Sequence, residues 1–219
     1  MPIRTLLWTI LFLSASFSAF SLGEGQTLFL GFGKGNDPSG LPDGWKERTF
    51  RKIPRHTIYS LEKEGDRLVL KAVSEQSASM LYRELEEDPK KYPLLRWDWK
   101  IENLLKKSDP TRKTGDDYPA RVYVAFNDFT GLNYIWESKV IRGKILPNPY
   151  MKEVKMIVVE SGRRKLGEWV QEKRNIQEDY KKVFGRDPPA LRGIAVMTDT
   201  DDTGEAATSY YAEIVLSSK

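Results

Sequence analysis

Hydrophobic and polar residues alternate along most of the chain. In the segment 94–101 the apolar residues Leu95, Trp97, Trp99 and Ile101 fall on one face, and charged residues fall on the other. Alternation with a period of two is typical of strands that turn one face to the core and the other to water. The same pattern, or a short strand-like apolar run, occurs at 28–32, 45–50, 57–62, 67–72, 78–85, 121–126, 132–138, 154–160, 168–174, 193–198 and 210–216.

About a dozen short strands separated by Gly, Pro and Asp turns indicate an all-β fold. We therefore predict an antiparallel β-sandwich, of the jelly-roll or galactose-binding-like kind. The apolar positions of its strands predict a core that contains Leu95, Trp97, Trp99, Val122, Val124, Phe126, Ile194, Val196 and Ile214. Another set of rings is expected nearer the surface, namely Tyr118, Tyr134, Trp136, Tyr150 and Tyr211.

One segment has the period of a helix. Apolar residues in 176–184 recur at the spacing of a single helical stripe. Asn175 is a good N-cap, and Gly185 can end the helix. We predict one short helix over 176–184 that closes an end of the sandwich.

The N-terminal residues predict export. Arg4 precedes an uncharged run rich in Leu and Phe, which is followed by small residues. This order is typical of a secretory signal peptide, and the apolar core is shorter than a membrane span of about 20 residues. We expect residues 1–21 to be a signal peptide and residues 22–219 to be a single β-sandwich domain. The domain would be periplasmic or secreted, with no stable membrane insertion after cleavage; a retained N-terminal anchor is the alternative.

Composition excludes several kinds of chemistry. The chain has no cysteine, so it can form neither disulfides nor thiolate metal sites. Its single histidine, His56, excludes a multi-histidine zinc site, and we expect this residue to be structural rather than catalytic. The 35 basic and 31 acidic residues are interspersed along the chain. Because a nucleic-acid binder normally has one basic face, we expect no nucleic-acid partner.

The segment 199–205 is the densest acidic cluster. Asp199, Asp201, Asp202 and Glu205 could together ligate a hard cation such as calcium, which prefers oxygen ligands. The alternative is a turn in which Asp and Thr side chains accept hydrogen bonds from backbone amides. We therefore expect no cofactor, or a structural calcium ion held by these four residues.

Two further polar loops, 106–118 and 141–151, also border predicted strands. Binding residues are common on loops above a rigid scaffold, and these loops could meet the acidic segment at one edge of the sandwich. We expect ligand contacts from Asp116, Asp117, Tyr118, Arg121, Asn148 and Tyr150. Solvated turn residues are the alternative for the two adjacent carboxylates.

Several stretches are specific enough to indicate a family. They are IPRHT at 53–57, WDWK at 97–100, GDDYPARVYV at 115–124, LNYIW at 132–136, NPY at 148–150, VESG at 159–162 and MTDTDDTGE at 197–205. Together they resemble an uncharacterised bacterial exported family, domain-of-unknown-function family 3047, from about residue 45 to residue 216. The resemblance implies a single exported domain, and it assigns no activity, ligand or catalytic residue.

The residues favour a non-catalytic binding domain for a glycan or another cell-envelope component. Abundant Tyr and Trp suit the apolar faces of sugars, and no Ser or Thr is visibly paired with a base. The competing function is a polysaccharide-active enzyme, a lyase or hydrolase on a jelly-roll scaffold. A lyase would need a base and a cation on one concave face. The candidates for these two groups are His56, Arg96, Arg121, Tyr123 and Tyr150. A purely structural envelope protein is a third possibility.

Overall fold

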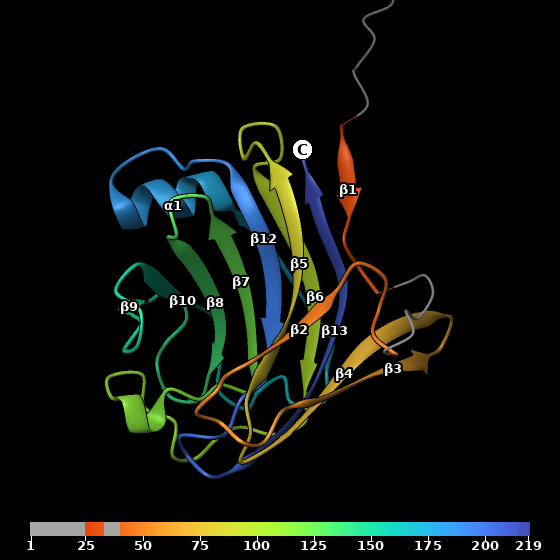
Figure 1. Ribbon diagram of the computed structural model, residues 1–219, viewed down its shortest axis with the longest axis vertical. Coiled ribbons are helices and arrows are strands. Elements are labelled where there is room, and N and C mark those ends of the chain that lie inside the picture. Colours follow the sequence, from red (N-terminus) through yellow and green to blue (C-terminus); the bar gives the residue numbers. More distant parts are fainter. Residues whose placement is uncertain (1–24, 33–39) are drawn as a thin grey trace, which may run out of the picture.

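The computed structural model describes residues 25–32 and 40–219 (Figure 1), so the predicted signal peptide lies outside the described residues. Within these ranges the chain forms two β-sheets, one α-helix and one short 3-10 helix, η1. The elements are β1 (Thr27–Phe29), β2 (Lys46–Thr49), β3 (Ile58–Glu64), β4 (Arg67–Glu75), β5 (Ser79–Glu87), β6 (Leu94–Ile101), η1 (Lys113–Gly115), β7 (Ala120–Phe126), β8 (Gly131–Glu137), β9 (Ile145–Pro147), β10 (Val154–Ser161), β11 (Val170–Asn175), α1 (Ile176–Phe184), β12 (Leu191–Met197) and β13 (Ala206–Ser217).

The two sheets form a sandwich. The six-stranded sheet has the order β11-β6-β13-β4-β3, with β1 beside β13, and the seven-stranded sheet has the order β2-β5-β12-β7-β8-β10-β9. Apolar side chains from both sheets form one core, in which the rings of Trp97 and Tyr134 stack at 5.2 Å between centroids. The predicted β-sandwich is confirmed, and all nine residues predicted for its core are buried.

The helix is confirmed with its predicted ends. α1 covers Ile176–Phe184, and the Asn175 side chain accepts hydrogen bonds from the backbone N–H groups of Gln177 and Glu178 at 3.1 and 3.2 Å. Gly185 ends the helix at φ +71°, a left-handed conformation that glycine adopts without steric cost. In residues 25–32 and 40–219 no helix is long and apolar enough to cross a membrane.

Two features differ from the sequence-based prediction. β8 and β10 pair in parallel, because the connection between them is long enough to return the chain to the same end of the sheet. Part of this connection forms β9, a strand too short to show a periodic pattern. The sheet is therefore mixed, with one parallel pair inside an otherwise antiparallel arrangement.

The predicted surface rings are a second difference. Tyr118, Tyr134, Trp136 and Tyr211 are buried, and only Tyr150, at 53% exposure, is open to solvent as expected. All seven residues of β8 are buried, because its inner face belongs to the core and its outer face packs under Tyr118 and the following loop. When both faces of a strand are buried, the sequence pattern of the strand does not indicate which of its rings are exposed to solvent.

Candidate functional site

The outer face of the seven-stranded sheet carries a row of two tyrosines and an alanine. Ala195 on β12 pairs in register with Tyr82 on β5 and with Tyr123 on β7. Since the neighbouring residues Ile194 and Val196 belong to the core, the alternation of side chains directs Ala195 to the outer face. Both tyrosines are partly exposed, so two rings flank a small residue across three adjacent strands.

The next row of this face has almost no side chains. Gly193 on β12 pairs with Ala125 on β7, which in turn pairs with Gly131 on β8. A Cβ atom on Gly193 would lie 2.8 Å from the carbonyl oxygen of Arg83 on the neighbouring strand, so this position requires glycine. Small residues in register on three strands leave the sheet hollow at this level.

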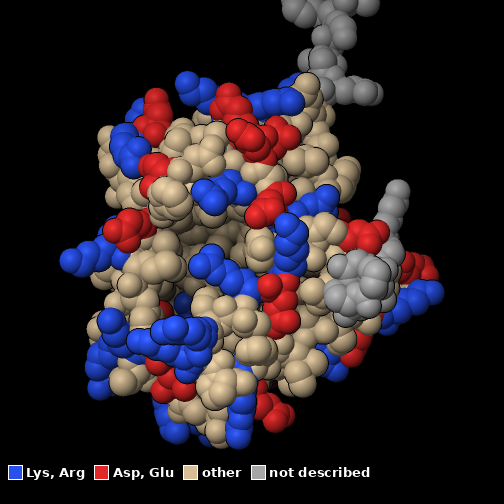
Figure 2. All heavy atoms as spheres, viewed as in Figure 1, with Lys and Arg blue, Asp and Glu red and all other residues tan. Residues whose placement is uncertain are grey.

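A cleft of about 810 Å³ lies over these two rows. Besides the tyrosines, its lining includes Phe129, Met151 and the cationic side chains of Arg48 and Arg192. The seven-stranded sheet faces the reader in Figure 1, and Figure 2 shows this face hollowed near its centre, with basic and acidic side chains around the hollow. Neither arginine forms an ion pair with any described residue, so both can donate hydrogen bonds to a ligand.

An aromatic ring stands at the rim of the cleft on a strained turn. Phe129, between β7 and β8, is 75% exposed and has φ +64°. A bulky residue rarely adopts positive φ, and such a conformation costs on the order of 1–3 kcal/mol. The guanidinium of Arg192 lies 5.3 Å from the centroid of the ring. The turn therefore holds an exposed ring beside a cation at the edge of the cleft.

Arg121 was expected to contact a ligand, but it is buried beside the cleft, on the same face of β7 as Tyr123. It is only 2% exposed, and its Nε donates to a carboxylate oxygen of Asp199 at 2.8 Å. One terminal nitrogen donates to the other oxygen of Asp199 and to the backbone carbonyl of Asp116. The other terminal nitrogen donates to the hydroxyl oxygen of Tyr123 at 3.1 Å. The guanidinium thus connects a buried carboxylate to a ring that lines the cleft.

Tyr118 and Asp116, two other predicted ligand residues, surround this arginine. The Tyr118 ring is buried 4.3 Å from the guanidinium carbon of Arg121, and it packs on the outer side of β8 and β10. A carboxylate oxygen of Asp116 lies 3.7 Å from the guanidinium. Both residues therefore support the interior of the site.

The acidic segment contributes one group of carboxylates that could hold a metal ion. Oxygen atoms of Asp117, Asp199 and Asp201 lie within 4.8 Å of one another. Burial, together with the charges of Asp117 and Asp202, raises the pKa of Asp201 to about 6. Asp117 also accepts hydrogen bonds from the backbone N–H groups of Thr203 at 2.6 Å and Asp202 at 3.4 Å, as in a turn. Features of both sequence-based interpretations, the cation site and the turn, are thus present.

The other two predicted metal ligands serve different partners. Asp202 accepts a hydrogen bond from the Tyr150 hydroxyl at 2.8 Å. Glu205 accepts hydrogen bonds from the backbone N–H groups of Lys106 and Lys107 at 3.1 and 2.9 Å. Neither Asp202 nor Glu205 therefore belongs to the group of carboxylates formed by Asp117, Asp199 and Asp201.

The polar loops meet, as the sequence suggested. Tyr150 joins the loop 141–151 to the acidic segment through Asp202, and its hydroxyl also donates to the backbone carbonyl of Lys113 at 3.3 Å. Asn148 shapes this loop, because its side-chain oxygen accepts hydrogen bonds from the N–H groups of Tyr150 and Met151 at 2.9 and 2.8 Å. The turn carries Met151 to the wall of the cleft.

The five residues considered for a lyase do not share one concave face. Arg96 lies on β6 in the other sheet, and His56 is an exposed residue that does not line the cleft. Arg121 and Tyr123 are in contact, but the arginine is buried and neutralised. Burial raises the pKa of Tyr123 to about 12, although the nearby guanidinium opposes this shift.

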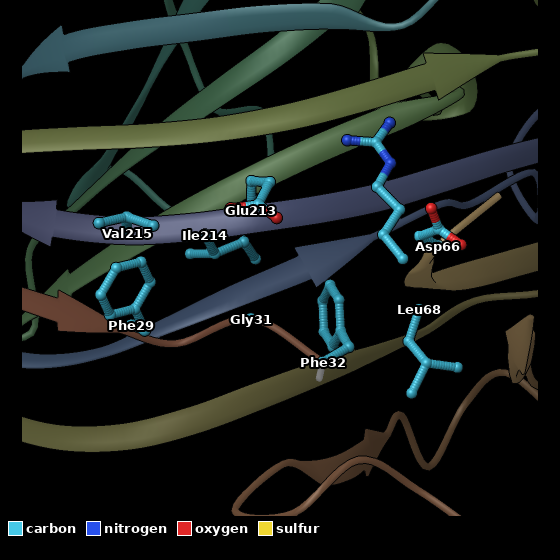
Figure 3. Close-up of a pocket in the computed structure, with 9 residues that line it drawn as sticks. Phe29, Gly31, Phe32, Asp66, Leu68, Glu213, Ile214 and Val215 are labelled. Atoms are coloured by element: carbon cyan, nitrogen blue, oxygen red, sulfur yellow. The ribbon is translucent and has the colours of Figure 1, made fainter. Parts of the chain in front are cut away.

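A second hollow, of about 340 Å³, lies against the six-stranded sheet (Figure 3). Figure 3 shows Phe29, Phe32 and Leu68 around it, with Asp66 and Glu213 nearby. Among the described residues of its lining, Arg67 is the only one with a cationic side chain, and it forms an ion pair with Asp98 at 3.0 Å. We assign the candidate site to the larger cleft, which combines rings with unpaired cationic side chains.

Sequence reasoning missed most residues of this cleft. Tyr82, Phe129 and Arg192 stand on three separate segments, and nothing in the sequence shows which strands lie side by side. The available signal was the presence of Gly and Ala at outward positions of strands, such as Gly193 and Ala195, because such positions leave room for a ligand.

Solved structures similar to this chain include carbohydrate-binding modules. The family 11 module of a cellulosomal cellulase of Clostridium thermocellum is 8% identical, with a TM-score of 0.45 and coverage of 89% of this chain and 95% of that chain. The family 29 module CBM29_1 from Piromyces equi is 11% identical, with a TM-score of 0.38 and coverage of 90% and 93%.

A further similar structure is the xyloglucanase domain of NopAA from Sinorhizobium fredii, at 9% identity and a TM-score of 0.47, with coverage of 80% of this chain and 95% of that chain. No curated protein matches the sequence. Residues 43–215 match the family model described as "Protein of unknown function (DUF3047)", and the chain therefore belongs to this family.

Proposed function

We propose that this protein is a non-catalytic glycan-binding domain and that its ligand occupies the cleft on the seven-stranded sheet. The row of Tyr82, Ala195 and Tyr123 beside a hollow of small residues carries the proposal. Aromatic rings pack against the apolar faces of sugars, and the low floor gives a sugar ring room to reach them. The volume of about 810 Å³ falls in the range of ligand pockets and exceeds that of the second hollow.

The rim supplies hydrogen-bonding groups for sugar hydroxyls. Arg48 and Arg192 offer donors, and Glu153 offers acceptors from the loop side of the cleft. Phe129 adds a third ring, which the hairpin turn between β7 and β8 holds in an exposed position at the rim. The same cleft therefore offers both kinds of contact that sugars use.

The predicted signal peptide supports a ligand outside the cytoplasm. We propose a cell-envelope glycan, met by the domain in the periplasm or after secretion. Mass spectrometry of periplasmic or secreted material should find the chain without its first 21 residues. Recovery of the exported protein with Met1 intact would contradict removal of the signal peptide.

A polysaccharide lyase is the second candidate, favoured by the contact between Tyr123 and Arg121. A lyase needs a base and a cation that neutralises a uronate carboxylate. The pKa of Tyr123, raised by burial to about 12, keeps its phenol protonated at neutral pH. Arg121 already neutralises Asp199 and is not exposed to substrate. Binding without turnover is therefore the better-supported function, and turnover of any envelope or uronate polysaccharide by the purified protein would refute it.

Filling the cleft tests the proposal directly. The substitution Ala125→Leu would place a larger side chain over the hollow row, whereas Ala206→Leu makes the same change at an exposed position of β13 in the other sheet. We expect the wild-type protein and A206L to be retained on a glycan array and A125L to lose retention while keeping its melting temperature within a few degrees. Equal retention of folded A125L and A206L would place the ligand elsewhere.

A further inference from the structure

We infer that the cleft selects an extended, ribbon-like β-1,4-linked glycan that crosses the strands, with alternate sugars stacked on Tyr82 and Tyr123. This inference rests on the proposed function and names the class of ligand for the same site. It follows from the register of β5, β12 and β7, which fixes the two rings on either side of Ala195.

The spacing of the rings carries the argument. Neighbouring strands lie about 4.8 Å apart, so side chains two strands apart in one row are separated by about 9.6 Å at their Cα atoms. In an extended β-1,4-linked chain each sugar is turned over relative to the previous one, so every second sugar presents the same face. The repeat of such a chain is close to twice the strand spacing. One sugar can therefore stack on Tyr82 while the next but one stacks on Tyr123.

The position between the rings suits the intervening sugar. Ala195 is small and has its side chain on the outer face, so it leaves room for a sugar whose orientation is reversed. The adjacent row of Gly193 and Ala125 leaves space for the substituents that project from one edge of the chain. Coiled α-1,4-linked chains and curved β-1,3-linked chains do not present alternate sugars along one straight line, so they can engage one ring but not both.

The strand positions of the two tyrosines are fixed before a ligand arrives, and one of the two rings is also held by a hydrogen bond. Tyr82 lies on a strand paired on both sides, with Lys46 of β2 and Ala195 of β12 as its partners. The hydroxyl of Tyr123 accepts a hydrogen bond from Arg121, which is itself fixed by Asp199. A spacing that is already fixed by strand pairing needs no ordering of the backbone on binding, so it contributes directly to selectivity.

The length of the ligand provides a sharp test. A disaccharide covers one ring and its neighbour, whereas a trisaccharide is the shortest chain that reaches both tyrosines. In calorimetric titrations with cello-oligosaccharides we expect the Kd to fall about two- to tenfold between cellobiose and cellotriose, the gain for one added aromatic contact. Cellohexaose should bind at least as tightly as cellotriose, and maltohexaose and laminarihexaose should bind more weakly than cellohexaose.

Single-ring variants test the same point independently. Tyr82→Ala and Tyr123→Ala should each remove the difference between cellobiose and cellotriose, because only one ring remains. The matched control is Tyr210→Ala on β13 of the other sheet, which should keep the difference. Melting temperatures show whether each variant is folded. If Y123A does not fold, because it loses the hydrogen bond with Arg121, Y82A still tests the inference.

The possible outcomes distinguish a failure of the inferred ligand class from a failure of the proposed glycan binding. If maltohexaose binds as tightly as cellohexaose, or if the two tyrosine variants retain the step between disaccharide and trisaccharide, the inferred ligand class is wrong while glycan binding stands. If the protein retains no glycan of any kind, including on the array, the proposed function fails and the inference fails with it.

Discussion

Removal of the buried guanidinium beside the cleft should show how much the ion pair between Arg121 and Asp199 stabilises the protein. The substitution Arg121→Met keeps a long apolar side chain but leaves the carboxylate of Asp199 buried without its cation. It also removes the hydrogen bonds that Arg121 donates to the backbone carbonyl of Asp116 and to the hydroxyl of Tyr123. The uncompensated charge would lie near two further carboxylates, those of Asp117 and Asp201.

The magnitude follows from the burial of the pair. Breaking a buried ion pair by removing one partner costs about 3–5 kcal/mol, because the remaining charge is stranded in a medium of low polarity. Total free energies of unfolding are about 5–15 kcal/mol, so the variant should remain folded at room temperature but with much of its stability lost. For a domain of this size, a loss of about 4 kcal/mol lowers the melting temperature by about 8–16 °C.

Urea denaturation followed by tryptophan fluorescence measures this loss. The matched control is Arg112→Met, which removes the ion pair between Arg112 and Asp109. The Arg112 side chain is 69% exposed, and surface ion pairs of this kind contribute about 0–1 kcal/mol to the free energy of unfolding. In the double variant Arg121→Met/Asp199→Asn the stranded charge is gone, so its loss should be at least about 1.5 kcal/mol smaller than the sum of the single losses. A loss below about 1 kcal/mol for R121M, or additive single losses, would refute the reasoning.

Three further predictions concern the acidic segment and the core. Millimolar calcium should raise the melting temperature, because a cation held by Asp117, Asp199 and Asp201 would bind only the folded state. EDTA should reverse this gain, and Asp201→Asn should abolish it. An unchanged melting temperature would favour the alternative interpretation, in which the acidic segment is a hydrogen-bonded turn without a metal ion. Because the pKa of Asp201 is raised from 3.8 to about 6 on folding, the folded state binds the extra proton between these values. Stability should therefore fall as pH rises from about 4 to 6, and pH-dependent urea titrations of D201N should show a flatter profile. In the core, Trp97→Ala should lower the free energy of unfolding by roughly 3–5 kcal/mol. Trp97→Phe should lower it much less, because the buried indole N–H has no hydrogen-bond partner among the described residues and its removal breaks no hydrogen bond. Equal losses for the two variants would contradict this reasoning.

The sequence was sufficient for those features that depend on local pattern. Alternation placed Trp97 and Trp99 in the core, and the cap residues Asn175 and Gly185 marked the ends of the helix. Arg121 illustrates the limit of such reasoning. A charged residue at an outward position of a strand suggests contact with solvent or ligand. Arg121 is nevertheless buried, because the preceding segment with Asp116 and Tyr118 and the distant residue Asp199 surround its guanidinium.

The cleft could not be predicted for a related reason. Tyr82, Tyr123 and Ala195 are far apart in the sequence, and their alignment depends on the register of three strands that only the folded sheet defines. The loops around the acidic segment could be expected to meet, because each borders a strand. Their individual contacts, such as that between Tyr150 and Asp202, depend on side-chain positions that no sequence pattern specifies.

The strand order of the seven-stranded sheet also determines when a binding surface can exist. β12 lies between β5 and β7, the strands that carry the two tyrosines, and it follows both of them in the sequence. A chain that is still being synthesised therefore carries both tyrosines before the strand that aligns them. Pairings between such distant segments also form slowly compared with local ones. The proposed glycan binding would therefore require a chain in which β12 is synthesised and paired, and a chain truncated before β12 should not retain the ligand.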